Sequence, residues 1–530
     1  MKRNLLRISS LALVLAMLVT ACGKSETPKE SESTGAVNGE ATEQAKNLTV
    51  AYNLEPASLD LQSVGLSSGG TTTGSFMFDT LVTYNSETNT VEPCVAESWE
   101  WVDDTTLRVK LREDVYAHNG YNIVADDILS MLERGVATAA LARYYGSIDL
   151  SRCAAVDTYT VDIALTAPNP VFLTTLAQSC YAISSKEGIE AQGGLEEFAR
   201  APQAMTGKYC FVEWVAGDHV TVKRNEDYWG EKAYYETVTI RFIPDDTSRL
   251  MALQSGDVDA VNRVLTSQTS TIAEGSGVSL VTIDNQLQMY NIFLNCAEGP
   301  LAETKVRQAM SLAFNREAAL QAILFGYGSV ADGLFPEGFS VYAEPNSTEM
   351  WQYDLERAKS LMAEAGYADG FDMTIILMEN QMYSDVAEFA QSAWGQLGIN
   401  VNIETSDSAS FFVKLNAGEY DAYSIANSGF DYTSVFKTFD DRLDYGQGGN
   451  TQFHYEDAET FYNLLDQIYT ETDNAAAVEI SGQIQDILRV EVPMIDVMNG
   501  SILFACDSDL TGYYLSPMGD PIFVDLQPAA

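Results

Sequence analysis

The sequence predicts an α/β protein, and three groups of strand and helix patterns support this prediction. From about residue 290 onward, apolar strand-like runs alternate with segments of helical periodicity, which is typical of a domain with a largely parallel sheet. Two earlier regions, near residues 107 and 206, show strand patterns bounded by turn residues. The chain has 530 residues, and the roughly 480 residues that follow its first 46 are enough for about three domains.

The first strand region follows the turn residues Asp103 and Asp104. Apolar and basic side chains alternate over residues 107–111, which predicts a half-buried strand. Residues 118–120 (His-Asn-Gly) form a further turn signal. Residues 125–134 place apolar side chains at helical spacing and predict a helix.

The second region predicts a long hairpin. Residues 206–215 and 219–225 are strand-like, and a Gly-Asp turn separates them. A further strand is expected at 240–243. A short helix is expected at 247–255, ended by Gly256.

The third region contains the strand–helix alternation. We expect strands at 290–295, 371–378 and 399–404, and helices at 305–324, at 355–365 (ended by Gly366) and at 384–397 (ended by Gly398).

The N-terminus has the pattern of a secretory signal. Lys2, Arg3 and Arg7 precede an apolar run over 8–21, and small residues lead to Cys22. The run is shorter than the ~20 residues of a membrane-spanning helix. Val-Thr-Ala-Cys resembles the lipobox of bacterial lipoproteins, which implies that residues 1–21 are removed and Cys22 is acylated; an ordinary signal peptide with a chance cysteine is the alternative. We therefore expect an extracytoplasmic protein, lipid-anchored on the outer face of the bacterial cell membrane, or in the periplasm of a Gram-negative cell.

Residues 22–46 have the composition of a flexible linker. The segment after Cys22 is rich in Ser, Thr, Glu and Gly and contains no aromatic residue. Such a segment buries too little apolar surface to offset its ordering entropy. As a coil it would span roughly 25–30 Å, and structure is expected to begin near residue 47.

The charge of the chain excludes one class of partner. The net charge is −45, and removal of residues 1–21 lowers it to −48 because three basic residues and no acid are lost. Nucleic-acid binding depends on Lys and Arg side chains that neutralise phosphates, so no nucleic-acid partner is expected for so acidic a chain. A solubilising acidic shell is our interpretation, with a preference for cationic or zwitterionic ligands as the alternative.

No metal or other cofactor is expected from the cysteines and histidines. The three histidines, His118, His219 and His454, are far apart, and no cysteine spacing matches a zinc motif. We expect buried thiols for the six cysteines other than Cys22, with one or two disulfides as the alternative. These six are Cys94, Cys153, Cys180, Cys210, Cys296 and Cys506.

Six groups of segments between residues 48 and 526 resemble a known family. They are VAESW at 95–99 with LREDV at 111–115 and NG at 119–120; GKY at 207–209 with NEDYWG at 225–230; LQSGDVD at 253–259; VRQAMSLAFNRE at 306–317; YDLERAKSLMAEAGY at 353–367; and LGINV at 397–401 with GEYD at 418–421. With the lipobox, they make the chain resemble the solute-binding proteins, family 5, of ABC importers, which include oligopeptide-, dipeptide- and nickel-binding proteins.

The resemblance implies a two-lobe periplasmic-binding-protein-like fold (class II, type C cluster) with an extra subdomain inserted in lobe one. Carried over to this chain, lobe one would comprise 47–80, 205–297 and 495–530, the inserted subdomain 81–204, and lobe two 298–494. The resemblance also implies a monomer without enzymatic activity, which captures a peptide or other small solute and delivers it to the transmembrane subunits of an ABC permease.

The resemblance implies that Asp431 binds the ligand. Peptide-binding members carry an aspartate after a Gly-Trp-x-x segment of lobe two, where it pairs with the free ammonium of the peptide, and residues 427–431 occupy that place. Such a pair with additional hydrogen bonds is a strong anchor; a solvated loop aspartate is the alternative. The remaining candidates are Asn427, Ser428, Gly429, Phe430, Leu54, Glu55, Gly69 and Gly70.

Two departures from the family pattern bear on the ligand. Ser428 replaces the tryptophan, which removes a stacking surface that Phe430 replaces in part. No Lys or Arg occurs between Lys359 and Lys414, where dipeptide binders carry an arginine for the ligand carboxylate. We therefore favour an oligopeptide, held by strand-like hydrogen bonds, over a dipeptide.

Other functions stay open at this point. The same fold would serve for a nickel chelate, an opine, a sugar or a haem, or for a sensor without a transporter. A serine hydrolase acting through Ser67 is a remote alternative, because Gly65–Gly69 matches GxSxG. That motif needs a strand directly before the serine, and the nearest good strand ends around Leu54.

Overall fold

The computed structural model describes residues 46–63, 67–85, 88, 90–331, 333–337, 339–347, 349–428, 431–443 and 449–529. Residues 46–530 form one compact unit. The predicted signal peptide, Cys22 and almost all of the linker lie outside the described residues, so these assignments stay predictions.

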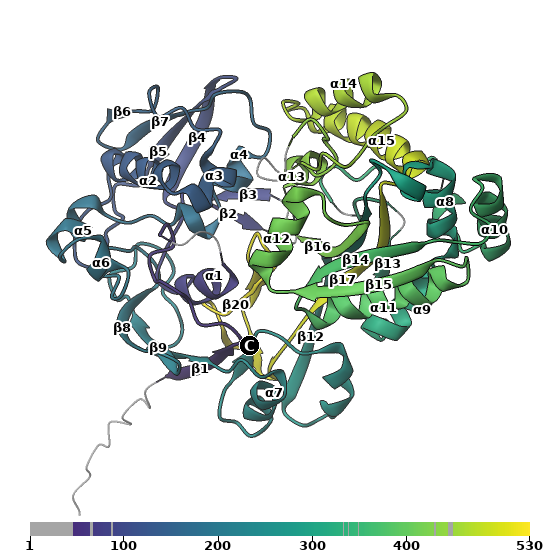
Figure 1. Cartoon of the computed structure of the whole chain (residues 1–530). Coiled ribbons are helices and arrows are strands. Elements are labelled where there is room, and N and C mark those ends of the chain that lie inside the picture. Colours follow the sequence, from purple (N-terminus) through teal and green to yellow (C-terminus); the bar gives the residue numbers. More distant parts are fainter. Residues whose placement is uncertain are drawn as a thin grey trace, which may run out of the picture. The chain divides into compact units, whose positions relative to one another are not determined.

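One 11-stranded mixed sheet organises residues 46–530 (Figure 1). Its order is β15 (Asn400–Ser406), β14 (Asp372–Met378), β16 (Ala422–Ser428), β12 (Val278–Leu294), β17 (Met494–Asp507), β11 (Ala260–Val261), β1 (Asn47–Tyr52), β10 (Thr237–Phe242), β9 (His219–Arg224) and β8 (Tyr209–Val215), and β13 (Gly328–Val330) pairs with β17 outside this order.

Two long antiparallel strands, β12 and β17, connect the two halves of this sheet. Residues 278–283 of β12 pair with 502–507 of β17, on the side where β17 meets β11. Residues 288–293 pair with 494–500 of β17, and residues 288–294 pair with β16. One of the two register shifts in the β12–β17 pair lies between Ile283 and Gln288, where the two halves meet. The lobe boundaries implied by the resemblance stay predictions.

The predicted strands and most predicted helices are present, but the prediction of a largely parallel sheet is only partly right. β14 pairs in parallel with β15 and β16, whereas β16 and β17 both run antiparallel to β12. More than 100 residues separate β12 from β16. The local alternation of apolar residues predicts a strand but not the direction of so distant a partner.

The single helix predicted over 305–324 is wrong, because the structure has two helices there. They are α8 (Thr304–Ala313) and α9 (Arg316–Leu324). Phe314 between them has extended backbone angles, and the Asn315 side chain caps α9 by accepting a hydrogen bond from the Ala318 N–H at 3.0 Å. Asparagine is a preferred N-cap residue, so the break has a local cause that the continuous apolar periodicity concealed.

A second, four-stranded sheet lies in the segment between β1 and β8. Its order is β4 (Ala96–Asp103), β5 (Thr106–Leu111), β7 (Thr160–Ala164) and β6 (Ala154–Asp157), and the hairpin of β2 (Val82–Asn85) and β3 (Thr90–Pro93) precedes it. The helix α2 (Ala125–Ala137) buries Ile128 and Leu132 in the same cluster as Leu107 and Val161. This segment therefore has a hydrophobic core of its own.

The remaining helices complete the unit. They are α1 (Ser68–Gly74), α3 (Ala142–Tyr145), α4 (Phe172–Thr175), α5 (Lys186–Ala191), α6 (Leu195–Phe198), α7 (Asp246–Gln254), α10 (Leu355–Glu364), α11 (Gln381–Gly395), α12 (Ser408–Ala417), α13 (Tyr432–Lys437), α14 (Ala458–Ile468) and α15 (Asn474–Glu491). The prediction of a helix start at 384 is three residues late, because the Asn380 side chain caps α11 by accepting a hydrogen bond from the Met382 N–H at 2.9 Å.

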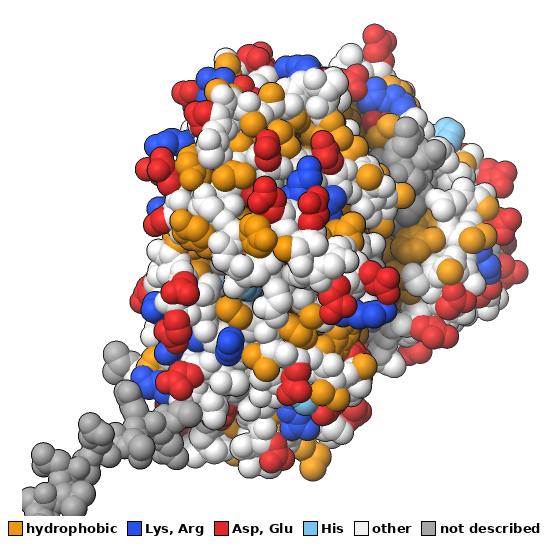
Figure 2. All heavy atoms as spheres, turned by 90° about the vertical axis from the view of Figure 1, so that its left-hand side faces the viewer, with side chains coloured by type: hydrophobic (Ala, Val, Ile, Leu, Met, Phe, Trp, Pro, Cys, Tyr) orange, Lys and Arg blue, Asp and Glu red, His pale blue; other side chains and the backbone are white. Residues whose placement is uncertain are grey.

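The six described cysteines are free thiols, and Cys94, Cys180, Cys296 and Cys506 are buried. Within the described ranges, no helix combines the length and the apolar character that a membrane crossing requires. Over the same ranges, no group of three or more His, Cys, Asp or Glu side chains is placed to hold a metal ion. Figure 2 shows acidic side chains spread over one face of the molecule with basic side chains between them.

Candidate ligand-binding site

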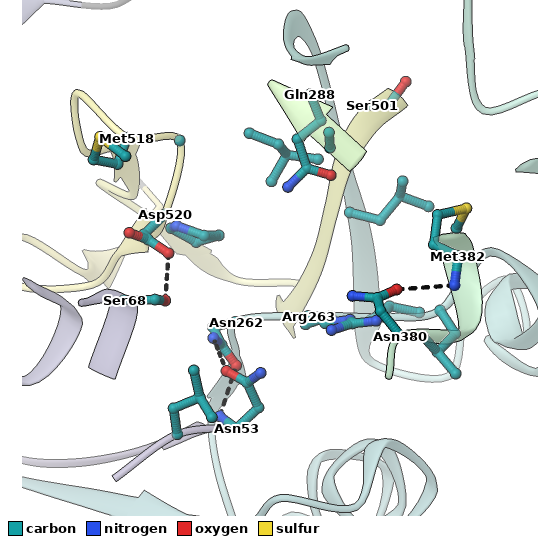
Figure 3. A pocket seen from close by; sticks show the side chains of 18 of the residues that line it. Asn53, Ser68, Asn262, Arg263, Gln288, Asn380, Met382, Ser501, Met518 and Asp520 are labelled. Carbon is teal, nitrogen blue, oxygen red and sulfur yellow. Dashed lines mark hydrogen bonds between the residues drawn. The ribbon is translucent and has the colours of Figure 1, made fainter. Parts of the chain in front are cut away.

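A cavity of about 460 Å³ lies where central strands from both halves of the sheet meet (Figure 3). Residues 53–54 reach it after β1, residues 262–266 after β11 and residues 380–383 after β14. Strands β12, β16 and β17 contribute further residues. The volume falls within the roughly 300–1,000 Å³ of sites for small ligands.

The wall of the cavity is mostly neutral. Apolar contact comes from Leu54, Leu324, Met382 and Met518, and Leu54 is about half exposed. Neutral donors and acceptors come from Asn53, Ser67, Ser68, Thr71, Asn262, Thr266, Gln288, Asn380 and Ser501. A polar solute with amide or hydroxyl groups therefore finds many hydrogen-bonding partners here.

A pair of asparagines fixes the floor of the cavity. The Asn53 N–H donates to Asn262 Oδ1 at 3.2 Å, and Asn262 Nδ2 donates to Asn53 Oδ1 at 2.9 Å. The two residues directly follow Tyr52 of β1 and Val261 of β11. Their reciprocal bonds hold the ends of these adjacent strands in register beside the cavity (Figure 3).

Asp520 and Arg263 are the one acidic and the one basic side chain among the described residues that line the cavity. Burial raises the pKa of the Asp520 carboxyl, and hydrogen bonds from Ser68 and Ser516 oppose this rise. The Arg263 side chain is 51% exposed. In the view of Figure 3, Asp520 and Ser68 lie on one side, and Asn380, Met382 and Arg263 lie on the other.

Strand β16 presents a free edge beside the cavity. On the β14 side, pairing is restricted to Ala422 and Tyr423, and within the described residues no strand pairs with 424–428 on that side. Ala426 lines the cavity. Burial raises the pKa of Tyr383, and the nearby Ala426 backbone opposes this rise. The unpaired edge of β16 therefore lies beside the site.

The structure places the lobe-one candidates at different distances from the cavity. Leu54 lies on its wall. The Glu55 carboxylate is hydrogen-bonded to the β8–β9 hairpin. It accepts hydrogen bonds from Trp214 Nε1 at 2.8 Å and from the Gly217 N–H at 3.0 Å. A Cβ at Gly69 would lie 3.0 Å from the Glu55 carbonyl oxygen, so close chain packing explains this glycine. Gly70 is buried in α1 and donates its N–H to Ser67.

Asp431 is the N-cap of α13 and does not line the cavity. Its carboxylate accepts hydrogen bonds from the Ser434 N–H at 3.1 Å, from Ser434 Oγ at 2.5 Å and from Thr433 Oγ1 at 2.6 Å. It also lies near Tyr144 of α3, where its charge adds to the rise in the Tyr144 pKa that burial causes. The side chain is thus already satisfied as a helix cap, which the sequence interpretation did not foresee.

The neighbours of Asp431 are described only in part. Asn427 and Ser428 end β16. Asn427 Nδ2 is buried and has no acceptor among the described residues. Gly429, Phe430 and the side chain of Ser428 lie outside the described residues.

The serine of the GxSxG match has a structural role. The Ser67 hydroxyl accepts a hydrogen bond from the Gly70 N–H at 3.2 Å and caps α1. Gly65 and Leu66 lie outside the described residues. Two histidines also have their own partners: His118 Nε2 bonds to the Gly207 carbonyl oxygen, and His219 Nδ1 bonds to Asp218. None of these contacts requires a catalytic role for Ser67.

Several lining residues were missed by sequence reasoning. Arg263 and Asn380 each follow a strand by two residues, and in α/β sheets such positions commonly face ligands. That signal was available for Asn380, because a strand was predicted at 371–378, but not for Arg263, because no strand was predicted at 260–261. Asp520 lies in a short segment between β19 (Tyr514–Leu515) and β20 (Pro521–Ile522), and no sequence pattern marks it as a site residue.

Comparisons with known proteins place this chain among extracellular binding proteins. The family described as bacterial extracellular solute-binding proteins, family 5 Middle, matches residues 90–449. The dipeptide-binding protein of Escherichia coli (strain K12) is 25% identical over 511 residues, which cover 90% of this chain and 94% of that protein.

Two solved structures show the same fold. NikA from Brucella suis in complex with Fe(III)-EDTA has a TM-score of 0.79 at 20% identity and covers 91% of this chain and 99% of its own. DppA from Helicobacter pylori in complex with the peptide STSA has a TM-score of 0.74 at 22% identity and covers 92% and 98%. The observed architecture is therefore the expected two-lobe binding-protein fold.

Proposed function

This chain belongs to the bacterial extracellular solute-binding proteins of family 5, and we propose that its solute is a peptide, which it hands on unchanged to the permease of an ABC importer. Among the proteins it resembles, one is named for binding dipeptides and another was solved with the peptide STSA. NikA, solved with Fe(III)-EDTA, shows that the same fold also holds a non-peptide solute. The choice between these classes rests on the site itself.

The free edge of β16 is the observation that carries the proposal. An extended peptide binds such an edge by adding a strand, and its main-chain groups then pair with those of the protein. Ala426 of this edge lines the cavity, and the surrounding neutral side chains can bond the outer edge of the peptide. Main-chain recognition of this kind tolerates different side chains.

Two residues at and after the end of β16 are candidate partners of the peptide. We propose Asp431 for the ammonium, by resemblance to the family loop, and Asn427 for a nearby carbonyl, because its buried Nδ2 lacks an acceptor among the described residues. A peptide of more than two residues is favoured, since the stretch between Lys359 and Lys414 holds no basic residue for the carboxylate of a dipeptide.

The setting of the protein completes the proposal. We propose that Cys22 carries lipid, that the linker up to residue 46 gives the binding unit reach, and that the protein works as a monomer beside the transmembrane subunits of its permease. A flexible linker of this length would allow roughly 25–30 Å of movement from the membrane face.

Co-purifying solutes test the proposal. Peptides released by denaturing the purified protein would be identified by mass spectrometry and resynthesised with one main-chain nitrogen methylated at a time. Strand addition predicts that affinity falls at alternating positions, because only every second N–H of a strand faces the protein edge. A chelate, opine or sugar in place of peptides, or equal affinity for all methylated forms, would contradict it.

A further inference from the structure

We propose that Arg263 binds a carboxylate of the solute, so that this protein selects peptides with an unblocked carboxylate. This inference rests on the proposed function, because it concerns the same cavity and assumes that peptides enter it. It assigns the carboxylate to a residue after β11, on the opposite half of the sheet from the stretch that lacks basic residues.

Arg263 lines the cavity. Among the described residues that line the cavity it is the one basic side chain, in a protein whose net charge is −45. Its side chain is 51% exposed, so it can be reached by a solute. In the view of Figure 3 it lies on the Asn380 side of the cavity, opposite Asp520.

The backbone that carries Arg263 is held on both sides. The Asn262 N–H donates to the Ala51 carbonyl oxygen at 3.2 Å, and the Val264 N–H donates to the Leu503 carbonyl oxygen at 2.9 Å. The neighbouring strands therefore fix the point from which the side chain leaves. A binding group on such a rigid element is better positioned than one on a loop.

The guanidinium of Arg263 is only loosely engaged within the protein. Its Nε lies 3.9 Å from Asp246 Oδ1, beyond the 2.7–3.2 Å of ordinary N–H···O hydrogen bonds. The same Asp246 oxygen accepts a hydrogen bond from Nη2 of Arg249, whose side chain is fully buried. Buried Arg249 needs this counter-charge, so Asp246 is committed to Arg249 rather than to Arg263.

The chemistry of the group defines its ligand. A guanidinium carries five N–H donors in a planar fork that matches the two oxygens of a carboxylate. Within the described part of the chain, the Arg263 guanidinium makes no hydrogen bond to another residue, which leaves its N–H groups for a solute. Asp520 is the one acid among the described lining residues, and it disfavours a carboxylate on its own side of the cavity.

A competition experiment tests the inference. Wild-type protein and the Arg263→Gln variant would each be offered an equimolar library of tri- to pentapeptides, synthesised both as free acids and as C-terminal amides, with and without Asp or Glu. Bound peptides would be quantified by mass spectrometry. Arg357→Gln is the matched control, because the Arg357 side chain is 43% exposed, contacts Glu349 at 3.4 Å and does not line the cavity.

The inference predicts that the wild type and Arg357→Gln enrich carboxylate-bearing peptides about tenfold or more over those without, as expected for a hydrogen bond to a charged group. Arg263→Gln should lose this preference and still bind amidated peptides. A preference for acidic side chains among the amides would locate the carboxylate on a side chain instead of the terminus. Binding of peptides by the wild type without any carboxylate preference would overturn the inference and leave the proposed function standing. Enrichment of no peptide at all would overturn both.

Discussion

The Ser68 hydroxyl donates a 2.5 Å hydrogen bond to Oδ1 of Asp520, across 452 positions of the sequence. This bond joins the start of α1 to the segment before β20, and both residues line the cavity. It offsets part of the cost of burying the Asp520 carboxylate, since a hydrogen bond to a charged group contributes about 1.5–3 kcal/mol. One wall of the binding site thus depends on two distant parts of the chain being folded together.

The buried Asp79 carboxyl should make stability depend on pH. Burial raises its pKa to about 6 from a usual 3.8, although Tyr228 Oη and Trp229 Nε1 donate hydrogen bonds to it. A folded-state pKa above the unfolded value means that the stabilising contribution is present below pH 3.8 and is lost as the pH rises through about 6. Relative to Asp79→Asn, the wild type should lose up to about 3 kcal/mol of unfolding free energy between pH 4 and pH 7.

Urea denaturation of both proteins across that pH range measures this difference. The asparagine variant is a suitable reference because its amide keeps one acceptor for Trp229 and one donor for Tyr228. A difference that stays constant from pH 4 to pH 7 would show that the pKa of Asp79 is not raised.

The buried ion pair of Arg307 and Glu491 should matter far more than an exposed pair. Arg307 Nη2 lies 3.0 Å from Glu491 Oε2, and both side chains are less than a tenth exposed. Glu491→Ala would leave a buried charge without its partner and should lower the unfolding free energy by about 3–5 kcal/mol. The exposed pair of Lys305 and Glu364, 2.8 Å apart, is the matched control, and Glu364→Ala should cost less than about 1 kcal/mol. Similar losses in the two variants, measured by chemical denaturation, would refute the distinction.

The two roles of Asp431 can be separated by substitution. Asparagine is as good an N-cap as aspartate but carries no charge, whereas alanine removes both the cap and the charge. If Asp431 holds the ammonium of the peptide, Asp431→Asn should bind a free-amine peptide about 30-fold more weakly, because breaking a desolvated charge pair costs roughly 2–5 kcal/mol. Asp431→Ala should in addition lose about 1 kcal/mol of stability.

Calorimetric titration with a co-purified peptide and its N-acetylated form gives the result. The acetylated form should bind the wild type weakly and lose little more in Asp431→Asn. Equal affinity of the wild type and Asp431→Asn for the peptide with a free amine would show that Asp431 is only a helix cap.

The lipid anchor predicts where a variant goes in the cell. Cys22 follows Val-Thr-Ala after an apolar run too short to span a membrane. Cys22→Ala should move the protein from the membrane fraction into the periplasm or the medium. Unchanged fractionation would show that something other than an acylated cysteine retains it, and radiolabelled palmitate incorporation into the wild type provides the positive control.

The sequence predicts local elements well because their signals are local. The hairpin of β8 and β9, the helix α7 with its terminal Gly256, and the strand β5 all have their turn or cap residues adjacent in sequence. The break between α8 and α9 was missed for the opposite reason: the apolar period continues through Phe314, and one capping asparagine outweighs it.

The site was harder to predict because it is made of distant segments. Leu54 was anticipated from the family resemblance, but Asp520 lines the cavity next to Ser68, which lies 452 positions away in the sequence. Arg263 is a candidate for binding the solute because Asp246 is hydrogen-bonded to Arg249 and lies 3.9 Å from Arg263. Such properties depend on which side chains compete for one partner, and spacing along the chain does not encode that competition.

Native mass spectrometry of the protein with a mixture of tri- to pentapeptides is the sharpest test of peptide capture. We expect one intact peptide per protein molecule, released with its mass unchanged after prolonged incubation. A protein that binds none of these peptides, or that returns them as cleaved products, would contradict a peptide-capturing function.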